Sequence, residues 1–407
     1  MTLEQMTPVY SLYFHIPFCV HRCAYCDFNT YAGQEAFIPA YVDAVCSEIR
    51  AVAVSARQRL TAHTIFFGGG TPSLLSTAQF EFILKTVQDC FHLPRDAEIS
   101  LEANPGTVSL DSLQDLRSLG FNRISLGVQS AHPDELRQLE RIHDHYDVIE
   151  AVRWSRRAGF DNLNLDLIFG LPEQSMDRWR ATVKLILGLR PDHLSLYALT
   201  VEHGTPFGRW AQRGLLSMPD PDVAADMYEW AGEALEAAGF EQYEISNWAK
   251  PNRQCRHNLQ YWRNQPYLGF GAGAHGSAGG LRIYNILRIK AYIERLHPDH
   301  LIPNNPFPLS PATVSRTNIS VRVEMQETML TGLRLTSEGV SEEDFADRFG
   351  VQMRNVFSME INELIGLGLL EWVRDDPCEG SEPSQGFLRL SKRGRLLGNQ
   401  VFMRFVD

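Results

Sequence analysis

The 407-residue sequence lacks any long uninterrupted hydrophobic run. No stretch approaches the roughly 18 consecutive apolar residues that a membrane-spanning helix needs, so we expect no transmembrane segment. The first ten residues contain Glu4 but no Lys or Arg, and they therefore lack the basic region of a secretory signal and the arginine-rich character of a transit peptide. We expect a cytoplasmic protein.

Positive charge is also scarce. The chain has 38 Lys and Arg against 49 Asp and Glu, a net charge of −11. This excess repels phosphate backbones and anionic lipids, so we expect no nucleic-acid partner. Hydrophobic residues make up 44% and charged residues 21%, close to the averages for globular proteins, and the length predicts two or three domains.

Cysteine is sparse except at one place. There are seven cysteines, an odd number, and three of them, Cys19, Cys23 and Cys26, lie within eight residues. This clustering argues against a disulfide framework and indicates metal ligation in a reducing compartment. Thiolates suit both iron–sulfur clusters and zinc, and a structural zinc site stays open as an alternative, with His15 or His21 as the fourth ligand.

Between residue 11 and about 200, short apolar and β-branched segments alternate with segments of helical period. The six expected strands are 12–16, 64–67, 98–103, 123–128, 162–169 and 193–199. Repeated strand–helix units predict an α/β fold with a parallel sheet, whose ligands gather at the carboxyl ends of the strands. The strands carry no G-x-G-x-x-G fingerprint, which favours a barrel or open barrel over the alternative, a doubly wound sheet.

The C-terminal part is expected to form a separate domain. Residues 297–311 contain five prolines, which is typical of a linker. Beyond it, helices are expected at 324–333, 341–349 and 352–367, strands at 369–373 and 387–390, and a helix from 391. This order resembles a winged helix, but 352–367 carries Arg354 against Glu360 and Glu363, unlike a basic recognition helix. A packing or docking domain is therefore the interpretation.

The segment Cys19-Val-His-Arg-Cys23-Ala-Tyr-Cys26 resembles the motif of the radical S-adenosylmethionine (SAM) superfamily. The resemblance implies a [4Fe-4S] cluster held by these three cysteines, with SAM on the open iron and a 5′-deoxyadenosyl radical as the reactive product. It also implies a radical SAM partial (β/α)6 TIM-type barrel with a C-terminal winged-helix-like α+β domain. The domains expected are the barrel at 1–220, an extension at 221–296, a linker at 297–320 and the C-terminal domain at 321–407.

The same resemblance implies the SAM contacts. They are Tyr13, Gly69, Gly70, Thr71, Glu102, Gln129, Arg141 and Asp166. Glycines expose backbone groups to the ligand's amino group, Arg141 offers a planar fork for its carboxylate, and the remaining polar side chains bond its polar or ribose parts. Each residue alone is more often structural or solvated, but they lie on or after separate strands and so converge.

Longer segments resemble the oxygen-independent coproporphyrinogen III dehydrogenases (HemN) and their relatives. These segments are His15-Ile-Pro-Phe-Cys19, 68–72, 101–105, 127–130 and 166–172. The dehydrogenases have a cysteine two residues after the third ligand, where this chain has Phe28, and they have a longer arm before the cluster than the 18 residues present here. In both respects the chain is similar to HemW, the haem-chaperone branch, as it is in the motif His257-Asn258-x-x-Tyr261-Trp262.

The resemblance therefore implies a haem chaperone that binds haem, the cluster and SAM, and that passes haem to acceptors such as respiratory haem proteins. The implied haem-binding residues are Cys255, His257, Asn258, Tyr261 and Trp262. Judged from the residues alone, a histidine beside two aromatics is more often part of a core. The alternatives are an active coproporphyrinogen III dehydrogenase and a zinc-stabilised binding protein. An electron donor is needed only if the radical chemistry is used, and we allow for a homodimer.

Overall fold

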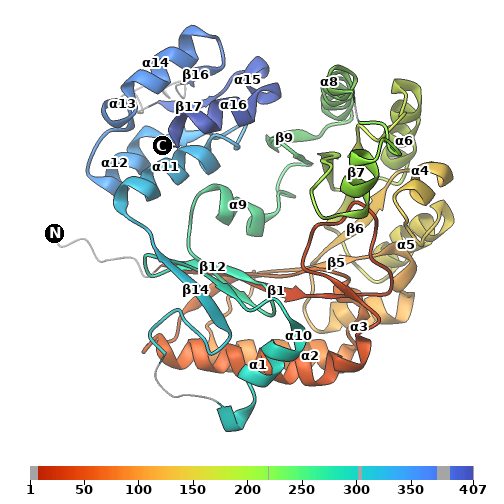
Figure 1. The fold of residues 1–407 in the computed structure, drawn as a ribbon, viewed down its shortest axis with the longest axis vertical. Coiled ribbons are helices and arrows are strands. Elements are labelled where there is room, and N and C mark those ends of the chain that lie inside the picture. The colour runs from red at the N-terminus through yellow and green to blue at the C-terminus, as the bar shows by residue number, and fades with distance from the viewer. Residues whose placement is uncertain (1–7, 219, 301–304, 374–385, 407) are drawn as a thin grey trace. The chain divides into compact units, whose positions relative to one another are not determined.

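The computed structural model describes residues 8–218, 220–300, 305–373 and 386–406 (Figure 1). By contacts the chain divides into two compact units, Met1–Ala234 with Pro266–Asn318, and Leu235–Gln265 with Ile319–Asp407. Residues 235–265, which the sequence analysis grouped with the barrel, thus lie in the second unit. The domain boundaries expected near 220, 296 and 320 stay predictions.

The centre of the first unit is a row of parallel strands at the six positions that the sequence predicts. They are β1 (Val9–Ile16), β4 (Thr61–Gly69), β5 (Glu98–Ala103), β6 (Arg123–Gln129), β7 (Leu163–Phe169) and β8 (His193–Ala198), neighbours in this order. The α/β class and the parallel arrangement are confirmed.

The other edge of β1 carries strands that the sequence analysis did not predict. β11 (Tyr267–Phe270) pairs with β1 in parallel. β12 (His275–Ala278), β13 (Leu281–Asn285) and β14 (Thr313–Asn318) then continue the sheet antiparallel. Gly269 in β11 and Gly276 in β12 weaken the strand pattern of these two strands.

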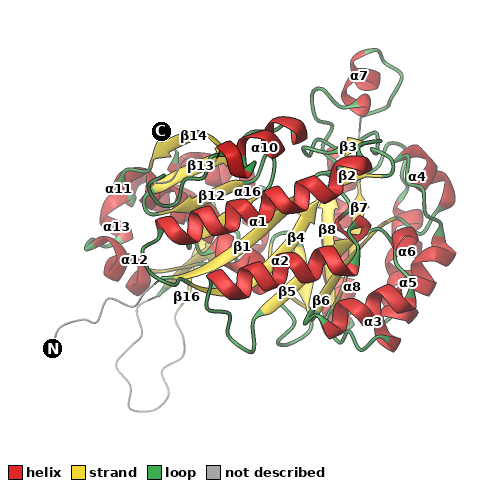
Figure 2. Ribbon diagram, turned by 90° about the horizontal axis from the view of Figure 1, so that it is seen from below, coloured by secondary structure: helices red, strands yellow, loops and turns green. Residues whose placement is uncertain are grey.

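Helices cover the sheet of the first unit, and Figure 2 shows α1 and α2 lying across it. The helices that lie wholly or mostly in the first unit are α1 (Ile38–Ser55), α2 (Thr77–Cys90), α3 (Leu110–Ser118), α4 (Pro133–Gln138), α5 (His145–Arg157), α6 (Met176–Gly188), α7 (Pro206–Gln212), α8 (Pro221–Ala237) and α10 (Ile289–Arg295), of which α7 lies apart from the sheet. Side-chain caps define several of their starts: Ser76 forms a capping box with Gln79 at α2, and Asp144 does so with Asp147 at α5. Within the described part of the chain, no helix combines the length and apolarity needed to cross a bilayer.

The strands alternate between an apolar and a polar face. On β5, Glu98, Ser100 and Glu102 share one face, and the buried Ile99 and Leu101 lie on the other. The same polar face continues across the next strands with Arg123, Ser125, Asn164, Asp166, His193 and Ser195. This part of the barrel interior is therefore polar, unlike the branched apolar filling of a closed TIM barrel.

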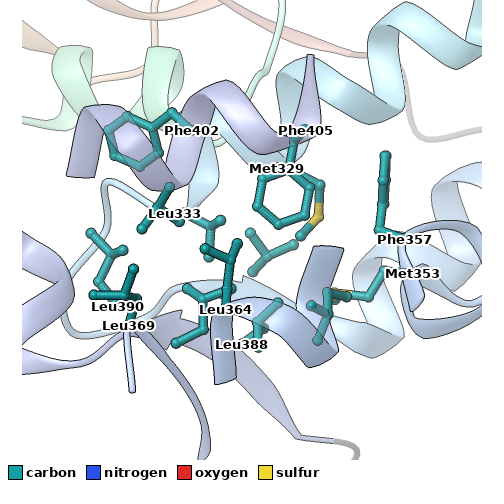
Figure 3. Packing of buried hydrophobic residues seen from close by; sticks show 14 of the residues in the cluster. Met329, Leu333, Met353, Phe357, Leu364, Leu369, Leu388, Leu390, Phe402 and Phe405 are labelled. Atoms are coloured by element: carbon teal, nitrogen blue, oxygen red, sulfur yellow. The ribbon is translucent and has the colours of Figure 1, made fainter. Parts of the chain in front are cut away.

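The second unit contains the hairpin β9 (Glu241–Glu244) and β10 (Asn247–Ala249), and α9 (Arg256–Trp262). Its later elements are α11 (Val321–Gly332), β15 (Val340–Ser341), α12 (Glu342–Phe349), α13 (Met353–Val356), α14 (Ser358–Gly366), β16 (Leu370–Val373), β17 (Phe387–Leu390), α15 (Lys392–Leu396) and α16 (Gly398–Phe402). The predicted helix 352–367 is broken at Phe357, where φ is −120° and ψ is 37°. That residue is fully buried, and Figure 3 shows its ring among the apolar side chains of this core.

Candidate functional site

A cavity of about 420 Å³ opens at the carboxyl ends of the parallel strands in the first unit. The predicted residues that line it are Cys19, Cys23, Cys26, Gly69, Gly70, Thr71, Glu102, Gln129, Arg141 and Asp166. The structure therefore brings together side chains from a loop after β1 and from the ends of β4, β5, β6 and β7. Tyr13 is not among the lining residues.

The cysteine loop is held at both ends. It lies between β2 (Phe18–Cys19) and β3 (Tyr31–Ala32), which pair in parallel. Inside the loop, Arg22 donates to the carbonyl oxygens of Cys26 (3.3 Å) and Phe28 (3.4 Å). Burial raises the pKa of the Cys19 and Cys26 thiols, so the protein alone keeps both protonated until a cation replaces the proton.

Tyr13 helps to hold this loop from below. Its hydroxyl lies 3.0 Å from His15 Nδ1, and His15 Nε2 lies 2.9 Å from the Asn29 carbonyl oxygen. Burial lowers the pKa of His15, so the neutral ring donates from Nε2 to the carbonyl and accepts from Tyr13 at Nδ1. The Tyr13 hydroxyl thus supports the loop that carries the cysteines, whereas the resemblance implied that Tyr13 contacts SAM.

The glycines after β4 pass close to the cysteine loop. Gly70 N donates to the Ile16 carbonyl oxygen (2.8 Å) and Thr71 N to that of Phe18 (2.7 Å). A Cβ on Gly70 would lie 2.6 Å from the Phe18 oxygen and 3.1 Å from Cys19 Sγ. Gly69 has φ of +109°, a conformation that side chains rarely adopt. A larger residue at Gly70 would push the cysteine loop away, and one at Gly69 would collide with the His15 ring.

The last residue of β6 is Gln129, and Arg141 lies just after α4. Gln129 has φ of +69°, an unusual conformation for a residue with a Cβ, and strain of this kind is often found at binding sites. Arg141 Nη2 donates to the Gly127 carbonyl oxygen (2.8 Å), and its Nη1 lies 3.6 Å from Cys23 Sγ. Its Nε is buried and has no hydrogen-bond partner among the described residues. The guanidinium is therefore held at the cavity wall by its Nη groups.

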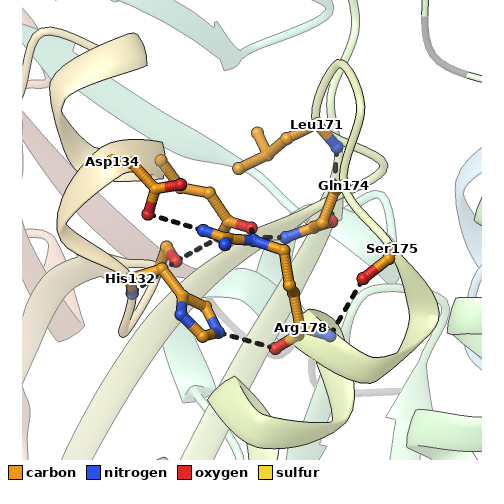
Figure 4. Close-up of polar contacts among 8 residues, drawn as sticks. His132, Asp134, Leu171, Gln174, Ser175 and Arg178 are labelled. Atoms are coloured by element: carbon orange, nitrogen blue, oxygen red, sulfur yellow. Dashed lines mark hydrogen bonds and ion pairs between the residues drawn. The ribbon is translucent and has the colours of Figure 1, made fainter.

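A network of polar side chains outside the cavity holds the segment that carries Gln129 and Arg141. Glu135 on α4 accepts from the hydroxyl of Ser130, the neighbour of Gln129, from Gln174 Nε2 (3.1 Å) and from Arg178 Nε (2.8 Å). Figure 4 shows Arg178 reaching from α6 to Asp134, a distance of 2.6 Å. The network ties the segment that presents Gln129 and Arg141 to the following strand–helix unit.

Two carboxyl groups, Glu102 and Asp166, face the cavity from β5 and β7. Burial and the nearby Asp166 carboxylate raise the pKa of Glu102 to about 7, although Gly69 N donates to its Oε2 (3.1 Å). Burial also raises the pKa of Asp166, against hydrogen bonds from Ser125, Ser195 and Asn164. The cavity thus brings the Arg141 guanidinium together with two buried carboxyl groups, Glu102 and Asp166, that a cationic ligand would help to ionise.

The sequence analysis missed the polar side chains behind these groups. Ser125 and Asn164 bond the Asp166 carboxylate at 2.8 and 2.7 Å. The available signal was the period-two spacing of polar residues in Arg123-x-Ser125 and Asn164-x-Asp166, because alternate residues of a strand share a face.

The residues expected to bind haem lie together on and beside α9 in the second unit. His257 is 1% exposed, and its Nε2 lies 2.9 Å from the Tyr261 hydroxyl. Cys255 is fully buried, and its N–H lies 3.3 Å from the Tyr243 hydroxyl oxygen. The Trp262 ring stacks under the Arg334 guanidinium at 4.4 Å. In this conformation the His257 imidazole is directed into a hydrogen bond and is not open to a ligand.

The donor set of the cavity fits a [4Fe-4S] cluster with SAM. Three thiols from one loop line it, and no three His, Cys, Asp or Glu side chains of the described residues converge as they would around a single metal ion. A cubane takes one thiolate per iron, so its ligands stand apart from one another. The Arg141 guanidinium at the cavity wall suits a carboxylate, and Glu102 and Asp166 suit a sulfonium and an ammonium group.

Comparisons with known proteins agree with this site. Residues 13–186 match the Radical SAM superfamily and residues 319–372 match the HemN C-terminal domain. The structure is similar to that of coproporphyrinogen III oxidase (HemN) from Escherichia coli, with a TM-score of 0.79 and 24% identity, over 98% of this chain and 90% of that one. The likeness confirms the expected fold. Fold and cavity together define a radical SAM protein with a HemN-type architecture.

The curated relatives narrow the family. "Heme chaperone HemW" from Bacillus subtilis (strain 168) is 37% identical over 398 residues, 97% of this chain and 99% of that protein. The protein of the same name from Lactococcus lactis subsp. lactis (strain IL1403) is 34% identical over 396 residues, 97% of both chains. That from Escherichia coli (strain K12) is 43% identical over 270 residues, 66% of this chain and 70% of that protein. The chain belongs to the HemW family.

Proposed function

We propose that the protein is a haem chaperone that binds haem, a [4Fe-4S] cluster and SAM, and that passes haem to acceptor proteins such as respiratory haem proteins. The observation that carries this proposal is the similarity to curated haem chaperones along nearly the whole chain. The cavity in the first unit supports the cluster and SAM parts of the proposal, and the haem part rests on the relatives' name and on the motif at α9.

In this proposal Cys19, Cys23 and Cys26 hold the cluster. Arg141 binds the SAM carboxylate through its guanidinium, the strand end at Gly69 to Thr71 offers backbone groups to the amino group, and Glu102, Gln129 and Asp166 bond the remaining polar and ribose parts. Tyr13 is retained as a residue that supports the cysteine loop through His15. A reduced cluster supplies one electron for cleavage of a bound sulfonium.

The haem part assigns iron ligation to His257, with Asn258, Tyr261 and Trp262 around it and Cys255 as a second ligand or attachment point. Imidazole is a common axial ligand of haem iron, and aromatic rings pack against porphyrin faces. Because His257 is buried and bonded to Tyr261, ligation requires that this hydrogen bond break and that α9 move. Haem binding is therefore expected to be coupled to a local opening.

One feature disfavours the dehydrogenase alternative. Phe28 follows Asp27 where the dehydrogenases have a cysteine, and this side chain lines the cavity and is 63% exposed. An exposed phenyl ring cannot ligate metal, and it suits an apolar ligand at the mouth instead. The proposed place of action is the cytoplasm, with an electron donor if SAM is cleaved and with a homodimer as one assembly to test.

The test combines haem titration with a turnover assay on anaerobically reconstituted protein. We expect the native protein to bind haem, as read from the Soret band, and not to convert coproporphyrinogen III to protoporphyrinogen IX when cluster, SAM and reductant are supplied. Robust porphyrinogen oxidation, or no haem binding by the native protein, would reject the proposal.

A pair of variants tests the assignment to α9. His257→Ala is expected to lose the Soret shift. Tyr261→Phe removes the hydroxyl that bonds His257 while keeping the ring, and so it is expected to strengthen haem binding. His203→Ala, at an exposed position bonded to Gln212, is the matched control and should bind haem like the native protein. Equal haem affinity in all three variants would remove His257 from the site.

A further inference from the structure

Side chains on its own strand and on the neighbouring strand β6 hold the Asp166 carboxylate by hydrogen bonds. Ser125 donates from its hydroxyl to Oδ2 (2.8 Å), and Asn164 donates from Nδ2 to Oδ1 (2.7 Å). Ser125 lines the cavity, whereas Asn164 is 2% exposed and does not. Asn164 therefore acts on Asp166 without contact with any ligand in the cavity.

Both polar atoms of the Asn164 side chain have hydrogen-bond partners. Its two N–H groups go to Asp166 Oδ1 and to Ser125 Oγ, both at 2.7 Å. Its carbonyl oxygen lies 2.6 Å from His193 Nδ1 and 3.2 Å from the Ser195 hydroxyl. An Asn side chain offers two donors and two acceptor sites, so Ser195 fills the second acceptor site when its one hydroxyl hydrogen points to Asn164 rather than to Asp166.

The orientation of this amide follows from its partners. An ionised Asp166 carboxylate can only accept hydrogen bonds, so the amide nitrogen of Asn164 must face it. The carbonyl then faces His193, which is fully buried and whose pKa burial and Arg123 hold well below its usual value. A neutral His193 donates from Nδ1 to that carbonyl. A flipped amide would place oxygen against oxygen at Asp166.

We infer that Asn164 is the positioning residue of Asp166, and that it fixes the direction of this carboxylate and keeps it ionised for a cationic ligand. The inference rests on the proposed SAM site and goes beyond it, since it concerns a side chain outside the cavity. The chain of contacts runs from His193 on β8 through Asn164 on β7 to Asp166 at the cavity wall.

Other charged groups also face Asp166. Glu102 on β5 opposes its ionisation, and Arg123 on β6 favours it. On β8, Ser195 is a hydrogen-bond partner and His193 is neutral. Loss of the Asn164 donors leaves Arg123, Ser125 and Ser195 to balance burial and Glu102. Protonated Asp166 would then persist to higher pH.

The test is SAM affinity as a function of pH, measured by equilibrium dialysis on cluster-reconstituted protein. In Asn164→Ala we expect SAM affinity to fall about tenfold or more at pH 7 relative to native protein, and the ratio of native to variant affinity to shrink as the pH is raised from 6 to 9. A purely structural role would lower affinity by the same factor at every pH.

Asn122→Ala is the matched control. Asn122 is also hydrogen-bonded through both amide atoms, to the Ile99 N–H (2.9 Å) and the Ala97 carbonyl oxygen (2.7 Å), but beyond the opposite end of the strands. Its SAM affinity should be native at every pH. Ser125→Ala removes the hydroxyl that donates to Asp166 Oδ2 and should show the same pH trend as Asn164→Ala. This variant provides the test if Asn164→Ala does not fold.

A pH-independent ratio in both Asn164→Ala and Ser125→Ala, or an equal effect in Asn122→Ala, would overturn the inference. Haem titration is a separate readout that these variants should leave unchanged. Native protein that binds SAM but not haem would reject the chaperone proposal and leave this inference standing.

Discussion

The three clustered cysteines differ from the other described cysteines in what surrounds them. Cys19 lies 3.7 Å from the Thr71 hydroxyl and Cys23 lies 3.6 Å from Arg141, both within the cavity wall. Cys90 lies on α2, outside that wall. The spacing in the sequence already separated these roles, because only clustered thiolates can share a cluster.

Replacing any one of Cys19, Cys23 and Cys26 by Ala is expected to abolish the cluster absorbance after anaerobic reconstitution, since each thiolate binds one iron. Cys90→Ala should reconstitute like native protein. Iron and sulfide analysis provides the measurement, and stoichiometric zinc without iron in native protein would contradict the prediction.

Glu102 makes SAM binding depend on pH. The pKa of Glu102 is about 7 in the protein without SAM, so this carboxyl group is half protonated at that pH. SAM carries a net positive charge and favours the ionised form, so binding below pH 7 must release a proton. We expect affinity to rise about tenfold from pH 6 to pH 8 and then to level off.

Glu102→Gln is the control for this dependence. It keeps the shape of the side chain and removes the titration, so its affinity should be lower than native at pH 8 and nearly flat between pH 6 and pH 8. An equally steep profile in Glu102→Gln would assign the pH dependence to another group.

At the scale of elements, contacts between helices α4 and α6 hold the segment that carries Gln129 and Arg141. Glu135 is buried and accepts three hydrogen bonds, one of them from Arg178 (2.8 Å). Sequence periodicity predicted the strands and helices but not this junction, because side chains 43 residues apart meet only after the strand–helix units have packed.

Arg178→Ala is expected to lower the free energy of unfolding by about 1–3 kcal/mol, because it takes a charged donor from the buried Glu135 carboxylate. Arg180→Ala on the same helix is the matched control. Its ion pair with Asp177 is exposed, so we expect a loss below about 1 kcal/mol. Urea titration of both variants measures these losses. Equal losses of unfolding free energy in Arg178→Ala and Arg180→Ala would contradict the prediction that the bond to the buried Glu135 stabilises the protein more than the exposed ion pair.

At the scale of the whole first unit, the Glu48 carboxyl group connects helix α1 to residues between 271 and 310. Glu48 on α1 is 1% exposed and accepts from Gly271 N (2.9 Å), Asn285 Nδ2 (2.7 Å) and the Tyr292 hydroxyl (2.6 Å). The Ser310 hydroxyl donates to it as well, at 2.7 Å. These contacts hold the strands added beside β1 to the first helix of the barrel.

Glu48→Ala is expected to lower the free energy of unfolding by about 3–5 kcal/mol, since several buried donors lose their acceptor at once. Asp43→Ala, at an exposed position of the same helix, should change it by less than about 0.5 kcal/mol. Thermal and urea unfolding provide the measurement. A small loss in Glu48→Ala would show that water replaces the carboxylate.

Local sequence patterns predicted the parallel strand–helix order and the cysteine loop, because hydrophobic period and thiol spacing are properties of neighbouring residues. The SAM contacts from Gly69 to Asp166 came from the family resemblance. The packed structure shows which side chains support these residues: Asn164 bonds Asp166, Glu135 bonds Ser130, and the Tyr13 hydroxyl lies beside His15. It also decided that His257 is buried against Tyr261. Burial and hydrogen-bond partners depend on neighbours that are distant in the chain, and a local pattern carries no information about which neighbours packing will supply.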